Sequence, residues 1–86
     1  MIKREELTNP SSCMSRARDD EMTFVLLGRD VSAPTTIRFW VNHRIASGKN
    51  EPDDPQIREA LECALSMEAE FARQMEAEFA KQRASK

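Results

Sequence analysis

The segment that follows Pro55 carries the pattern that most constrains the fold of this chain. From Ile57 onward, apolar residues recur three and four positions apart, which is the spacing of one face of an α-helix. Asp53 or Asp54 followed by Pro55 is typical of a helix start. The pattern predicts a long C-terminal helix with one apolar stripe formed by Ile57, Ala60, Leu61, Ala64, Leu65, Met67, Phe71, Ala72, Met75 and Phe79.

A duplicated unit, MEAEFARQMEAEFAKQ, occupies residues 67–82 of this predicted helix. Eight residues overshoot two helical turns by about 80°, so the repeat does not produce the seam of a two-stranded zipper. One interpretation is an arm for self-association or partner binding, because Met75 and Phe79 would otherwise stay exposed. The alternative is a surface helix stabilised by the i, i+3 pairs Glu70–Arg73, Arg73–Glu76 and Glu78–Lys81.

A shorter helix is predicted between Ser32 and Ser47. Ser32 is a candidate N-cap, Pro34 suits the first turn, and Gly48 ends the pattern. The apolar face would comprise Ala33, Ile37, Trp40, Val41 and Ile45, and it leaves Phe39 and His43 on another side. The two predicted helices form a hairpin joined by residues 48–55.

The run Thr23–Leu27 ends at Gly28 and favours a short buried strand, because it is apolar and contains a β-branched residue. The chain offers no second strand, so we expect this one to pair with another copy or to pack as an extended segment under the helices. The candidate oligomer interface consists of Phe24, Val25, Leu26, Met67, Phe71, Met75 and Phe79.

The expected fold is therefore mainly α: a short N-terminal strand, then a helical hairpin with a long C-terminal helix, assembled into an oligomer. Residues 1–21 read as a flexible polar segment, 22–73 as one small domain, and 74–86 as a helical extension. The 86 residues carry a formal charge of −2 and no apolar run long enough to span a membrane, which suggests a cytoplasmic protein. Cys13, Cys63 and the single His43 do not form a metal-binding pattern, so no metal or cofactor is expected.

Two charged residues interrupt the apolar faces. Arg44 lies between Trp40 and Ile37, and Glu68 lies within the stripe of the long helix. In a hairpin the two could meet as a buried ion pair. Alternatively, Arg44 extends along Trp40 toward solvent.

The segment from Gly28 to Lys49 is rich in basic and aromatic residues. Arginine suits phosphate and an aromatic ring can stack on a base, so the segment is a candidate nucleotide site. The alternative to a nucleotide site is that Trp40 belongs to the core and the arginines are exposed to solvent. The candidate ligand-binding residues are Arg29, Arg38, Phe39, Trp40, His43, Arg44 and Lys49.

Other classes of function are disfavoured. No nucleophile is placed beside a base in a recognisable order, so we expect a binding protein and not an enzyme. Asp53, Asp54 and Glu59 would present negative charge at the start of a recognition helix, which argues against DNA binding.

The central segment TFVLLGRDVSAPTTIRFWVNHRIASGKN, followed by QIREALECALSME, resembles a group of small bacteriophage and prophage proteins. The resemblance covers residues 21–72. It implies a phage accessory protein in the cytoplasm of a bacterial host, most simply an anti-defence inhibitor that sequesters a nucleotide immune signal. Two alternatives stay open: a protein–protein inhibitor of a host defence protein, and a structural or assembly component.

Overall fold

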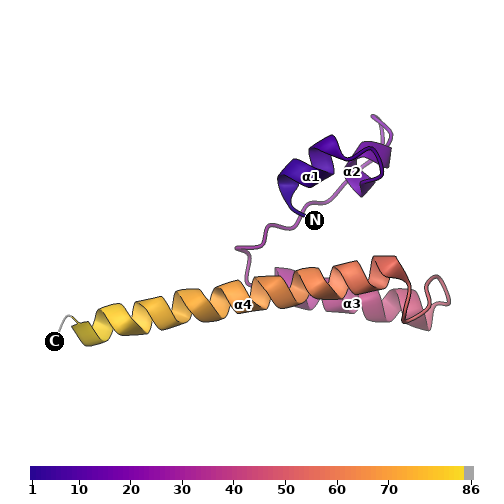
Figure 1. Ribbon diagram of the computed structural model, residues 1–86. Helices are drawn as coiled ribbons and strands as arrows, with labels where there is room; N and C mark the ends of the chain where they lie inside the picture. The colour runs from indigo at the N-terminus through magenta and orange to yellow at the C-terminus, as the bar shows by residue number, and fades with distance from the viewer. Residues whose placement is uncertain (85–86) are drawn as a thin grey trace.

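The computed structural model describes residues 1–84. Each of its two longer helices begins at or next to a proline. Helix α3 (Ala33–Ala46) has Pro34 in its first turn, and α4 (Pro55–Ala84) begins at the proline itself. The shorter helices α1 (Lys3–Thr8) and α2 (Cys13–Arg16) precede them. The predictions of a mainly helical fold, a hairpin and a long C-terminal helix are confirmed (Figure 1).

Helices α3 and α4 pack side by side as an antiparallel pair, and the core lies between them (Figure 1). Ile57 and Ala60 from α4 pack against Val41 from α3. Around this centre lie the partly buried side chains of Ile37, Ile45 and Leu61. Trp40, predicted for the core face, lies at its edge and is 38% exposed.

The turn between the helices, residues 47–54, is held by polar contacts. Gly48 has a φ of +74°, a left-handed conformation that glycine adopts without strain. The Asn50 side chain accepts a hydrogen bond from Arg44 Nε at 2.6 Å and donates to Asp54 Oδ2 at 3.0 Å. These contacts tie the end of α3 to the start of α4 and so fix how the two helices are aligned.

Helix α4 is much longer than the helix that covers it. At 1.5 Å per residue, α3 spans roughly 21 Å and α4 roughly 45 Å. The second half of α4 therefore extends past the end of α3, as the yellow end of the ribbon in Figure 1 shows. Residues 85–86 of the predicted extension lie outside the described residues.

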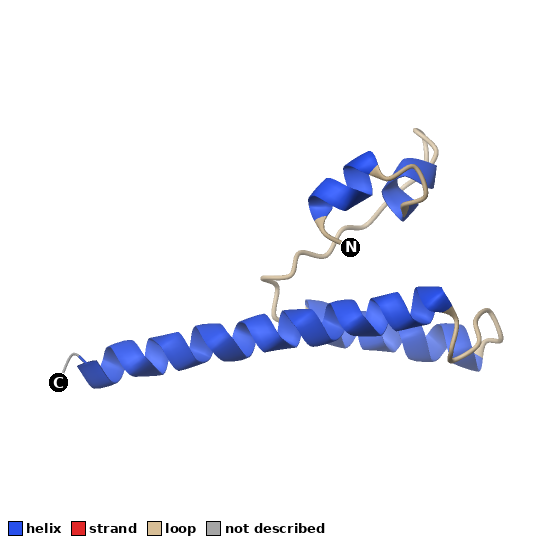
Figure 2. Cartoon of the chain, viewed as in Figure 1, coloured by secondary structure: helices blue, strands red, loops and turns tan. Residues whose placement is uncertain are grey.

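The predicted strand is wrong. Among residues 1–84 the structure contains no strand, and residues 22–27 form an irregular connection to α3 (Figure 2). A strand needs a neighbouring strand to pair with its backbone N–H and C=O groups, and residues 1–84 provide none. Phe24 is 86% exposed and Val25 is also exposed, whereas Leu26 is partly buried.

The start of α3 also differs in detail from the prediction. Ser32 occupies the N-cap position, but its hydroxyl makes no capping hydrogen bond. Instead, the Ser32 backbone N–H donates to Asp30 Oδ1 at 2.8 Å, and Thr36 Oγ1 donates to the Ser32 carbonyl at 2.8 Å. The aspartate two residues upstream therefore organises the turn that leads into the helix.

Candidate functional site

Helix α3 carries two side-chain contacts at i, i+4 spacing that involve an aromatic ring. The rings of Phe39 and His43 are stacked with centroids 6.3 Å apart, and Phe39 is 73% exposed. The guanidinium of Arg44 lies over the Trp40 ring, 5.6 Å from its centroid. This second contact matches the expectation that Arg44 extends along Trp40.

The basic residues of the candidate nucleotide site do not converge. Arg29 precedes α3 and Lys49 follows it, so roughly 20 Å of helix separates them. Arg38 forms an ion pair with Glu68 at 2.5 Å, and Arg44 donates to Asn50. Within one chain, the guanidinium groups of these two arginines already have acceptors and do not face a shared pocket.

The predicted ion pair between Arg44 and Glu68 does not form, because Glu68 pairs with Arg38. Arg44 lies near the C-terminal end of α3, whereas Glu68 lies beside the first half of α3, where Arg38 is located. The Arg38–Glu68 pair is also not buried, with side chains 41% and 47% exposed. An ion pair this exposed contributes at most about 1 kcal/mol to stability.

The strongest candidate site is an apolar row on the half of α4 that α3 does not cover. We call Phe71, Met75 and Phe79 the distal seam. Counted at 3.6 residues per turn, these positions continue the stripe that begins at Ile57 and Leu61. Met75 and Phe79 are 62% and 56% exposed, and Phe71 is partly buried. A shallow hollow of about 200 Å³ lies along the seam, lined by Met75, Glu78, Phe79 and Gln82.

Met67 precedes the seam and differs from it. Its side chain is partly buried and lies beside Gly28, in the segment that leads into α3. Of the predicted interface residues on α4, Met67 is thus covered in part by the chain itself, whereas Met75 and Phe79 are open to a partner.

Charges are distributed unevenly around the distal seam. Glu76 follows Met75 and Glu78 precedes Phe79, so the two carboxylates lie on opposite flanks of the seam. Arg73 and Lys81 fall on the far side of the helix, and Arg73 pairs there with Glu70. Among the residues with described side chains, 1–82, neither Glu76 nor Glu78 has an ion-pair partner.

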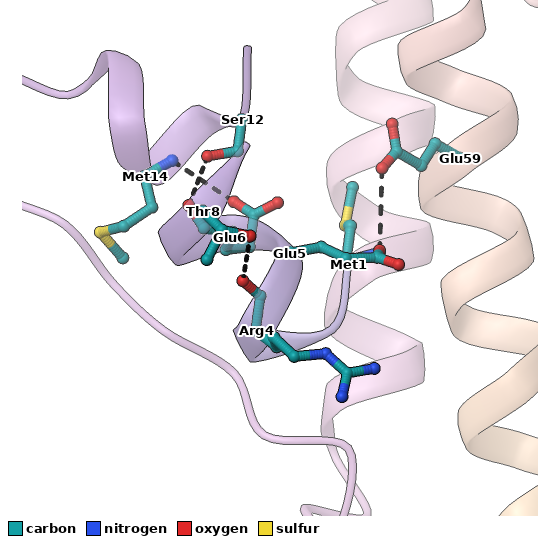
Figure 3. A network of polar contacts seen from close by, with 8 residues as sticks. All are labelled: Met1, Arg4, Glu5, Glu6, Thr8, Ser12, Met14 and Glu59. Atoms are coloured by element: carbon teal, nitrogen blue, oxygen red, sulfur yellow. Dashed lines mark hydrogen bonds and ion pairs between the residues drawn. The ribbon is translucent and has the colours of Figure 1, made fainter. Parts of the chain in front are cut away.

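A second hollow, of about 850 Å³, lies between the N-terminal helices and the hairpin. The Met1 amino group is 3.9 Å from Glu59 Oε1, and Figure 3 shows this contact beside the hydrogen bonds that fold α1 onto α2. Phe24, Leu26 and Trp40 contribute apolar surface, while Glu5, Glu6 and Glu59 outnumber Arg16 among the charged lining residues. Excess carboxylate makes this hollow unfavourable for a phosphate.

The sequence pattern does not predict this hollow, because the composition of residues 1–21 is typical of a flexible polar segment. They form two short helices with no buried residue. One local signal was present in the sequence: the Ser12 hydroxyl caps α2 by accepting from the Ser15 N–H at 3.1 Å, as serine commonly does before a helix.

Within residues 1–84, no group of three or more His, Cys, Asp or Glu side chains is placed to hold a metal ion. None of the helices described here has the length and apolar character needed to cross a membrane. No family model, curated protein or solved structure matches this chain.

Proposed function

We propose that this protein acts by binding another protein through the distal seam of α4. The observation that carries the proposal is the continuity of the apolar stripe. Helix α3 covers the stripe as far as Glu68, Phe71 beyond it is partly buried, and no element within the described residues covers Met75 and Phe79. Apolar side chains in a row at the surface are typical of interaction sites. A helix that presents such a row is also a common way for one protein to dock on another.

The resemblance to small phage proteins suggests the biological setting. In this proposal the protein is a phage accessory factor that inhibits a host defence protein by occupying a surface which that protein needs. The hairpin holds α4 in place, and the overhanging half of α4 reaches the partner.

Site-specific photocrosslinking in bacterial cells tests the proposal. A photoreactive residue at Met75 should give one discrete crosslinked product, because this position would lie within the interface. The same residue at Ala77, which lies on the far side of the helix, serves as the matched control and should give little product. Equal crosslinking from both positions, or none from Met75, would contradict the proposal.

Nucleotide sequestration remains a second candidate, favoured by one observation. The stacked rings of Phe39 and His43 are exposed on the outer face of α3, where a base could extend the stack. Phosphate recognition would then need arginines from several copies, because Arg38 and Arg44 are engaged within each chain.

Native mass spectrometry with cyclic di- and trinucleotides separates the two candidates. Because Arg38 and Arg44 are already paired within each chain, we expect the protein mass to remain unchanged across the panel. Stoichiometric gain of a nucleotide by a defined oligomer, lost in Arg38→Glu and retained in the surface control Arg18→Glu, would instead support sequestration.

A further inference from the structure

We infer that the partner contributes an amphipathic helix whose apolar residues are flanked by lysine or arginine. This inference rests on the proposed function and specifies the chemistry of the partner. It follows from the surroundings of the distal seam, where Glu76 and Glu78 border the apolar row on either side. A helix with basic flanks would place a cation opposite each carboxylate.

Charge also argues against a second copy of this chain as the occupant. Both flanks of the distal seam are acidic over residues 71–82, while Arg73 and Lys81 lie on the far side of the helix. Whether two copies paired parallel or antiparallel, an acidic flank would lie against an acidic flank. Like charges that face each other across an interface weaken that pairing and favour a partner of opposite charge.

The spacing of the seam sets the contact geometry. Phe71, Met75 and Phe79 form an i, i+4, i+8 ridge, and ridges of this kind pack into the matching grooves of another helix at a crossing angle of about 50°. Helices that cross at this angle touch over only a few turns. The interface should therefore fall below about 1,200 Å² in total, the size range of weak and transient contacts.

Two synthetic peptides test the inference against the full chain. Each is a helix of about four turns with leucines at i, i+4 and i+8. One has lysines on both flanks of the leucine row, and the other has glutamates there. Fluorescence anisotropy should give the lysine peptide a dissociation constant on the order of 10 µM, about tenfold or more below that of the glutamate peptide. The difference should shrink in about 0.5 M salt.

Matched variants locate the effect on the helix. Binding of the lysine peptide should be lost in Met75→Ala/Phe79→Ala, and should weaken about fivefold in Glu76→Gln/Glu78→Gln. Glu51→Gln/Glu62→Gln makes the same change in net charge away from the distal seam and should leave binding unchanged. Because none of these side chains belongs to the hairpin core, circular dichroism should show that every variant remains folded.

The outcomes distinguish this inference from the proposed function. If both peptides bind the seam equally well, the partner need not be basic and the inference fails, whereas the binding role of the seam stands. If sedimentation shows a dimer that Met75→Ala/Phe79→Ala abolishes, the occupant is a second copy and the inference also fails. If neither peptide binds and Met75 gives no crosslink in cells, both the inference and the proposed function fail.

Discussion

Replacing Ile57 with alanine is expected to unfold most of the α3–α4 hairpin at room temperature. Ile57 is the largest fully buried side chain among the described residues, at 0% exposure, and it packs at the centre of the core with Val41 and Ala60. Truncating a buried isoleucine to alanine costs about 2–5 kcal/mol. A core of this size provides only a few kcal/mol of net stability, so the loss approaches the total.

The measurement is urea unfolding followed by circular dichroism at 222 nm, a helix band. Leu65→Ala is the matched control: it removes a side chain of similar size from the same helix, at a position that is 58% exposed. We expect the control to shift the midpoint only slightly. Similar shifts for the two variants would show that Ile57 is not the centre of the core.

The sequence was sufficient to predict α3 and α4 because their signals are local. The 3.6-residue period, Pro34, Pro55 and Gly48 each act within one or two turns of the chain. Local signals are not sufficient to predict whether Thr23–Leu27 forms a strand, because apolar and β-branched residues favour a strand only where a neighbouring strand exists. The hollow between the N-terminal helices and the hairpin depends on how α1 and α2 are placed relative to α3 and α4. No local sequence pattern predicts that placement.

The mistaken pairing of Arg44 with Glu68 has a simple geometric origin. Both residues lie on an apolar face, but contact across an antiparallel hairpin also requires similar distances from the turn. Arg44 is two residues before the end of α3, whereas Glu68 is thirteen residues into α4. At 1.5 Å per residue this is a mismatch of roughly 16 Å, and Arg38 is much closer to the level of Glu68.

Enlarging a small residue in the helix contact should have the second large effect. Ala60 and Ala64 lie one turn apart on α4 and are almost completely buried, at 4% and 0% exposure. Ala60 packs in the core with Val41 of α3, and Ala64 lies one turn further along the same face of α4. Ala64→Leu would force the larger side chain into this contact, and overpacking of this kind costs about 1–3 kcal/mol.

The same urea experiment measures this effect, with Ala69→Leu as the control because Ala69 is exposed on the same helix. Leucine and alanine have similar helix propensities, so the control should change the free energy of unfolding by less than about 0.5 kcal/mol. Unchanged or increased stability in Ala64→Leu would mean that the contact has room for a larger side chain. In that case the position of α3 on α4 would be set mainly by the Asn50 turn and the Arg38–Glu68 pair, and Asn50→Ala should destabilise the hairpin more than Ala64→Leu.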